Sequence, residues 1–120
     1  MYSWFRPFLG SPGNRQNLSR FSVAFEKTKA TAWVCQEDKT ALGAVSFLRS
    51  HGIRVPEDIS VVGFENWREA YEQHLTTYDF NMAGMVRQAL LMILDENLFQ
   101  NTPAISEVDG YVVERRTTRK

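Results

Sequence analysis

The amino-acid sequence predicts an α/β fold built around a parallel sheet, and three neighbouring segments support this. Two short apolar runs, Ala32–Cys35 and Ile59–Phe64, have the length of buried strands. The segment between them has helical spacing from about Lys39 to His51, and Gly52 follows where a left-handed residue ends a helix. A strand, a helix and a strand in this order form a right-handed crossover, which predicts a parallel sheet covered on both faces.

The amino-terminal part is predicted to precede the fold. Residues 1–20 contain the turn signal Ser11–Asn14 and no helical periodicity, so they are predicted as a tail or linker, with the domain at residues 21–120. Ser19 is expected to cap the first helix. One face of that helix carries Phe21, Ala24, Phe25 and Thr28.

The carboxy-terminal part predicts more elements of both kinds. Asn66–His74 is predicted as a polar loop with one helical turn, and Leu75–Phe80 as a short strand. Asn81 is expected to cap a helix that runs to Asn97, whose apolar face is interpreted as core. That face consists of Met82, Val86, Ala89, Leu90 and Ile93, with Met85 and Met92 nearby. Ala104–Val108 and Tyr111–Arg116 are predicted as strand segments.

Composition excludes several classes of protein. The 14 basic and 14 acidic residues balance, so no basic surface for nucleic acid or membrane is indicated, and Arg115–Arg116 are interpreted as part of a solvated end. The single cysteine, Cys35, excludes an internal disulfide and fits a cytoplasmic protein. No secretory signal, transmembrane segment, catalytic motif or metal-ligand spacing is present, so no enzyme and no cofactor are predicted.

The order of three motifs is more specific than any one of them: the run VCxxDxxALGAxxxLRxxGIRVPEDISVVGF, then Leu75–Thr77, then Val113–Thr118. Together they resemble the carboxy-terminal half of the effector-binding domain of LacI/GalR-type transcription regulators. The resemblance covers about residues 21–120 and implies a partial, three-layer, periplasmic-binding-protein-like (type I) subdomain. The family binds DNA through a helix-turn-helix headpiece, and neither that headpiece nor the first half of the effector domain is in this chain.

Three acidic side chains at the ends of adjacent predicted strands are the candidate site. The resemblance implies that Glu37 and Glu65 face a small, sugar-like effector, where the family usually has asparagine and aspartate. Trp67 is expected to supply an aromatic wall, because ligand pockets combine apolar surfaces with few polar groups. Asp38 is assigned to capping the following helix.

Two other interpretations of these acids remain open. Carboxylates at strand ends also bind Mg²⁺, as in receiver-like phosphoryl-acceptor modules, although no basic partner follows at the receiver spacing. The acids also fit a truncated remnant in which they are solvated loop ends without a working site.

One helix is expected to face a partner. Gly43, Phe47 and His51 fall on the side of the Lys39–His51 helix opposite its core face, so Phe47 is expected to be exposed. The resemblance places this helix at the family's dimer interface. Gly43 and Phe47 are therefore predicted to form the contact of a homodimer.

Overall fold

The computed structural model describes residues 14–95, 97, 100 and 106–119, and the side chains from Ser19 onward. The elements are the helices α1 (Asn14–Lys27), α2 (Asp38–Ser50), α3 (Arg68–Glu72) and α4 (Met82–Leu94), and the strands β1 (Ala32–Val34), β2 (Ser60–Phe64), β3 (Thr76–Asp79) and β4 (Tyr111–Val113). The predicted crossover is thus present as β1, α2 and β2. None of the described helices is long and apolar enough to span a bilayer.

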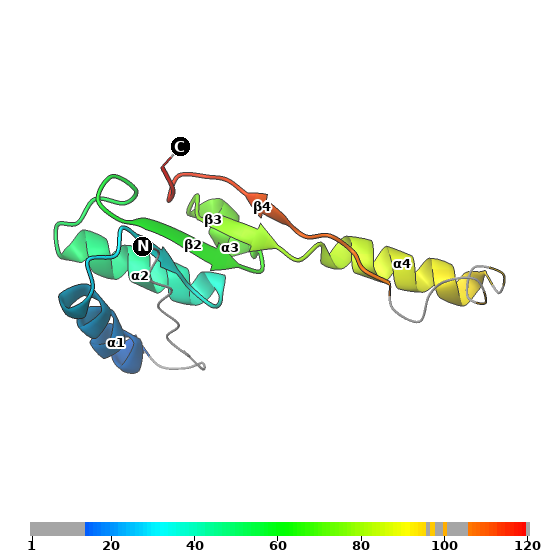
Figure 1. The fold of residues 1–120 in the computed structure, drawn as a ribbon, viewed down its shortest axis with the longest axis horizontal. Helices are drawn as coiled ribbons and strands as arrows, with labels where there is room; N and C mark the ends of the chain where they lie inside the picture. The colour runs from blue at the N-terminus through cyan, green and yellow to red at the C-terminus, as the bar shows by residue number, and fades with distance from the viewer. Residues whose placement is uncertain (1–13, 96, 98–99, 101–105, 120) are drawn as a thin grey trace.

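The sheet is mainly parallel. Its strand order is β1-β2-β3-β4, in which β1, β2 and β3 run parallel and β4 returns antiparallel beside β3 (Figure 1). Trp33 pairs with Val61 and Gly63 pairs with Thr77, so these residues share one face of the sheet. The fold is therefore mixed α/β, as predicted.

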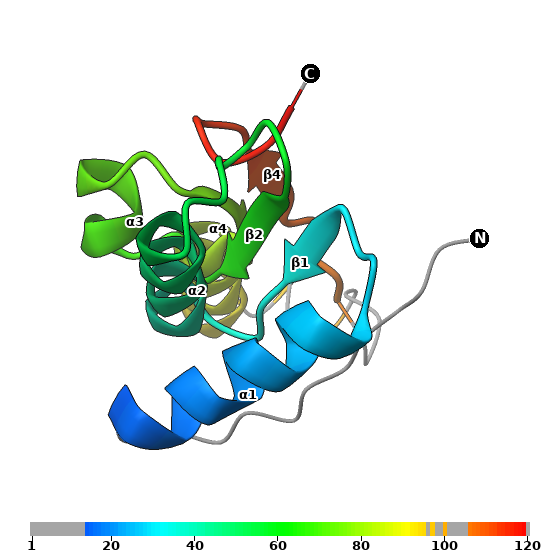
Figure 2. The same cartoon turned by 90° about the vertical axis from the view of Figure 1, so that its left-hand side faces the viewer.

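The core lies between this face and the helices. Figure 2 shows α2 and α3 along one side of the sheet, with α1 beside α2. Ala41, Ala44 and Leu48 of α2 are fully buried, as their helical spacing predicts, and they pack with Val61 and Leu75 from the strands. The expectation of cover on both faces is wrong for the described residues. Val34 and Val112 leave 46% and 63% of their surface exposed.

The segment that follows β4 lies against the amino-terminal ends of β2 and β3. The Thr117 side chain is buried, and its hydroxyl donates to the Val61 carbonyl (2.7 Å) and accepts from the Thr76 N–H (2.9 Å). The Val61 N–H donates to the Thr117 carbonyl at 2.7 Å. This segment therefore satisfies backbone groups of two strands that would otherwise be orphaned.

Helix α1 begins earlier than the sequence predicted. Ser19 lies inside the helix, which starts at Asn14, so the capping assignment of Ser19 is wrong. Residues 14–20 of the predicted tail are helical, whereas residues 1–13 lie outside the described residues. A polar first turn without hydrophobic periodicity gives no sequence signal for this extension.

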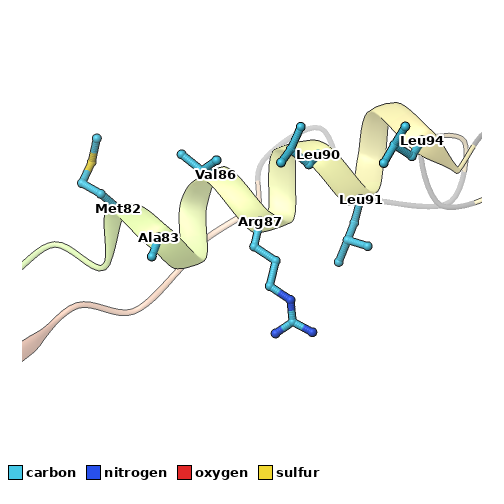
Figure 3. Close-up of a pocket in the computed structure, with 7 residues that line it drawn as sticks. All are labelled: Met82, Ala83, Val86, Arg87, Leu90, Leu91 and Leu94. Atoms are coloured by element: carbon cyan, nitrogen blue, oxygen red, sulfur yellow. The ribbon is translucent and has the colours of Figure 1, made fainter.

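Helix α4 is not part of the core, contrary to the prediction. The cap is correct, because Asn81 Oδ1 accepts from the Gly84 N–H at 3.1 Å. None of the helix's residues is buried, however, and the helix extends away from the sheet (Figure 1). In Figure 3 Met82 and Val86 point to one side of α4, and Arg87 and Leu91 to the other.

The last predicted strand segments are only partly present. Tyr111–Val113 forms β4, but the following residues do not continue as a strand. Of the predicted segment Ala104–Val108, residues 106–108 are not in a strand, and residues 104–105 lie outside the described residues.

Candidate functional site

The carboxyl ends of three parallel strands bring the predicted site residues to one edge of the sheet. Gln36–Asp38 follows β1, Glu65–Trp67 follows β2, and Phe80 follows β3. Because β4 is antiparallel, its first residue, Tyr111, lies at this same edge, paired with Asp79. The carboxyl edge of a parallel sheet is where open α/β folds bind ligands.

The turn after β2 has an unusual backbone. Glu65 and Asn66 both have positive φ angles, 104° and 52°, in a region that non-glycine residues rarely adopt. The Glu65 N–H donates to the Tyr78 carbonyl at 2.9 Å, and the Asn66 N–H donates to the Thr77 hydroxyl at 3.3 Å. Such conformations persist where surrounding contacts hold them, and they gather at functional sites.

The Asp38 side chain stabilises this turn and does not cap its own helix. Its buried carboxylate accepts from the Thr77 hydroxyl (2.5 Å, Oδ1) and from the Trp67 N–H (2.8 Å, Oδ2). The N-cap position of α2 belongs to Glu37, so the assignment of Asp38 as a cap is wrong. Gly63 is required opposite Asp38, because a Cβ there would collide with Oδ1 of the carboxylate.

Glu37 lies at the start of α2 beside the turn. Its backbone is extended, its side chain makes no capping bond, and the Thr40 hydroxyl donates to its Oε1 at 3.0 Å. This bond uses one of the carboxylate's acceptor positions. The other carboxylate oxygen is available to accept from a ligand.

The three acids lie close enough to influence one another. The pKa of Glu65 is raised, first by partial burial and then by the negative charges of Glu37 and Asp38, while a hydrogen bond from Trp67 acts in the opposite direction. A neighbouring negative charge disfavours ionisation of a carboxyl group. The structure therefore brings together the acids that the sequence placed at separate strand ends.

Aromatic side chains line the same edge. Trp67 is 59% exposed beside Glu65, which leaves its ring free to contact a ligand. Phe64, Tyr78 and Phe80 form a cluster whose ring centroids lie 5.4–5.9 Å apart. The sequence analysis did not single out this cluster, although Phe64 and Phe80 end predicted strands and Tyr78 lies within one.

A polar network behind the turn was also missed. Arg115 Nη2 donates to Asn66 Oδ1 at 2.6 Å, and Asn66 Nδ2 donates to Asp79 Oδ2 at 2.8 Å. Asp79 also accepts from the Asn81 N–H at 2.7 Å, and these donors lower the pKa of its carboxyl group. Arg115 is half-buried, so its interpretation as a solvated end is wrong.

The residues predicted at a dimer interface contact another helix of the same chain. Phe47 is only 5% exposed, so the expectation of an exposed ring is wrong. It packs against Phe21 and Trp33, with ring centroids 5.7 and 6.5 Å away, and against His51 at 4.2 Å. A Cβ on Gly43 would lie 3.5 Å from the Phe21 ring. The contact between two copies through Gly43 and Phe47 stays a prediction.

Neither the cysteine nor a metal site adds chemistry within the part of the chain that the structure describes. Burial raises the pKa of the Cys35 thiol to about 12, which keeps it protonated and unreactive. Within residues 19–95 and 106–119, no three His, Cys, Asp or Glu side chains are grouped to hold a metal ion.

The fold and the site define a class, an α/β ligand-binding domain with its polar groups at strand ends. Residues 6–118 match the model of the periplasmic binding protein-like domain, and the chain belongs to this family as part of a LacI/GalR-type effector-binding domain. This match begins inside the predicted tail, and the boundary at residue 20 stays a prediction.

Relatives and solved structures agree with this family. The HTH-type transcriptional repressor PurR of Yersinia enterocolitica is 36% identical over 98 residues, which are 79% of this chain and 29% of that protein. The PurR of Serratia proteamaculans is 33% identical over 116 residues, covering 94% of this chain and 32% of the repressor. The chain thus spans about a third of the length of these relatives.

Solved structures give the same result. A LacI-family regulator from Corynebacterium glutamicum has a TM-score of 0.69 and 30% identity, over 92% of this chain and 44% of that one. The Lac repressor bound to ONPG has a TM-score of 0.71 and 25% identity, over 88% of this chain and 33% of the repressor.

Proposed function

We propose that the chain is the ligand-sensing part of a LacI-type regulator and that its strand-end site binds a small, sugar-like effector. The observation that carries the proposal is the convergence of Glu37 and Glu65 beside the exposed ring of Trp67. Carboxylates accept hydrogen bonds from hydroxyl groups, and an aromatic face packs against the apolar side of a sugar ring. The ONPG-bound Lac repressor supports a small-molecule ligand in a protein of the same fold.

The two glutamates set the chemistry of the ligand. A hydrogen bond to a charged group contributes about 1.5–3 kcal/mol, so two such bonds orient a small polyol. Where the family resemblance leads us to expect asparagine and aspartate, this chain has Glu37 and Glu65. Two acceptors with negative charge favour a ligand with many donors, or one that carries a cationic group.

The site of this chain supplies one wall. The chain covers 33–44% of the matched structures, and effectors of the resembled family lie between two subdomains. A formed pocket typically buries about 70–90% of its ligand, which a one-sided site does not. We therefore expect the 120-residue chain to bind effector no tighter than roughly millimolar, about −4 kcal/mol.

The same family membership motivates the wider role. We propose that the whole regulator binds DNA through a helix-turn-helix headpiece, as the resembled regulators do, and that it is a cytoplasmic homodimer. The PurR relatives are HTH-type transcriptional repressors, which supports the role in transcription. The cytoplasmic location and the homodimer are proposed from the family resemblance alone.

A titration of the isotope-labelled chain followed by NMR tests the proposed site. D-ribose, D-galactose, D-glucosamine and lactose are suitable probes, because shift changes report millimolar binding. Glu65→Ala should abolish the shifts, whereas Glu69→Ala, which removes an exposed acid of α3, should retain them. Equal affinity of Glu65→Ala and wild type would remove Glu65 from the site. Tight binding of Mg²⁺ in place of sugars would favour the metal module instead.

A further inference from the structure

Arg115 reaches the ligand-facing turn from a segment distant in sequence. Its guanidinium donates from Nη2 to Asn66 Oδ1 (2.6 Å) and from Nη1 to the Leu75 carbonyl (2.7 Å). The same group lies over the Tyr71 ring, 5.8 Å from its centroid. Its backbone N–H donates to the Thr76 hydroxyl at 2.9 Å, which ties this residue to β3. Arg115 is thus held on several sides and aimed at one residue of the turn.

The chemistry of its partners fixes the orientation of the Asn66 amide. A guanidinium only donates and the Asp79 carboxylate only accepts, so Oδ1 must face Arg115 and Nδ2 must face Asp79. An amide held at both ends cannot rotate. Asn66 and Glu65 are the two adjacent residues with positive φ, so this bond network holds the backbone that carries the Glu65 side chain.

We propose that Arg115 is a positioning residue for the strand-end site, acting through Asn66 to hold Glu65 where it meets a ligand. This inference rests on the proposed function, because it needs Glu65 to contact the effector. The side-chain hydrogen bonds of Arg115 go to Asn66 and the Leu75 carbonyl, and not to Glu37 or Trp67. Its effect on ligand affinity is therefore indirect and passes through the turn.

Arginine is required for this geometry. Two separate nitrogens of one planar group reach Asn66 and the Leu75 carbonyl at once, while its central carbon lies over the Tyr71 ring. A lysine ammonium keeps the charge but is a single point donor on a flexible stem. Arg115→Lys should therefore retain only part of the ligand affinity that Arg115→Gln loses.

The test uses the full chain with Arg115→Gln, Arg115→Lys and the matched control Arg116→Gln, an exposed neighbour with the same change in charge. NMR without ligand reports the amide shifts of Glu65 and Asn66 and the titration of Asp79. In Arg115→Gln both amides should shift and the Asp79 pKa should rise, because Asn66 no longer donates firmly to that carboxylate. Affinity for a sugar probe that binds wild type should fall about tenfold or more, as expected for a lost charge-assisted bond.

Asn66→Gly keeps the proposal testable if Arg115→Gln does not fold. Glycine adopts the φ of 52° without strain, so this variant removes the side-chain link but retains the turn. Its affinity loss should match that of Arg115→Gln, and the double variant should lose no more than either single one. Unchanged Glu65 and Asn66 shifts in Arg115→Gln, or additive losses in the double variant, would overturn the positioning role. Failure of every sugar to bind the wild type would instead contradict the proposed function. In that case the spectra recorded without ligand would still show whether Arg115 holds the turn that carries Glu65.

Discussion

The hydroxyl of Thr77 in β3 donates to the carboxylate of Asp38 at the start of α2, at 2.5 Å and in a fully buried environment. The second oxygen of the same carboxylate receives the Trp67 N–H at 2.8 Å. One side chain therefore joins the crossover helix, the third strand and the turn after β2. A buried charge is tolerated here because hydrogen-bond donors surround it.

Asp38→Asn should destabilise the chain more than it alters any ligand contact. The amide replaces one acceptor oxygen by a donor, so either Thr77 or Trp67 loses its acceptor, at a cost of about 1–3 kcal/mol. Asp38→Ala should cost more, because both donors lose their partner. Urea unfolding of Asp38→Ala, Thr77→Val and the double variant measures the coupling between them. Strictly additive losses would show that the two side chains act independently.

Glu65→Gln should stabilise the folded chain at neutral pH. The raised pKa means that the folded state binds this proton more tightly than the unfolded state does, so stability falls as pH rises through the folded pKa. Glutamine mimics the neutral form, and its advantage should vanish below the ordinary glutamate pKa of about 4.3. Thermal unfolding of wild type and Glu65→Gln at pH 7 and pH 3.5 measures this difference in stability, with Glu69→Gln as the control. Equal melting temperatures at pH 7 would contradict it.

Phe47→Glu should unfold the contact between α1 and α2. The ring is buried against Phe21 and Trp33, so the substitution removes packing and leaves a charge among apolar groups. Loss of a buried phenylalanine alone costs about 3–5 kcal/mol. Ser46→Glu adds the same charge at an exposed position of the same helix and should be nearly neutral. If Phe47→Glu retains wild-type stability but sediments as a smaller species, Phe47 serves a contact between copies instead.

The isolated chain should self-associate through α4. Leu90 and Ile93 leave 52% and 75% of their surface exposed, and no residue of this helix is buried. Exposed apolar surface of this extent favours association with another apolar surface. Leu90→Lys combined with Ile93→Lys should shift sedimentation toward monomer, whereas Gln88→Lys should not. The same distribution for all three proteins would place any association elsewhere, for example at the open edge of β1.

The local elements could be predicted because their signals lie within a few residues of one another. The strands β1, β2 and β3 and the helix α2 each lie within one or two residues of the predicted bounds, since apolar runs and helical spacing reflect burial directly. The cap of α4 by Asn81 was predictable for the same reason. The place of Glu37 and Glu65 at one edge followed from the crossover, which brings parallel strand ends together.

The errors concern residues whose partners are distant in sequence. Asp38 occupies a position where capping is common, but its hydroxyl partner lies 39 residues further on. Arg115 finds Asn66 49 residues away. Phe47 was placed on an outer face because nothing in its own helix indicates that α1 covers it. The apolar side of α4 has the pattern of a core helix, yet the described part of the chain supplies no surface to cover it.

The Thr117 hydrogen bonds also determine when the sheet can be completed during protein synthesis. Thr76 must wait for a partner 41 residues later, and Val61 for one 56 residues later. At a translation rate of about 5–20 residues per second, these groups remain unpaired for roughly 2–11 seconds. The nascent chain can form β1, α2 and β2 in that interval, but not the Thr117 hydrogen bonds that join β2 and β3. A molecular chaperone that recognises unpaired strands therefore has a window of seconds in which to bind this protein.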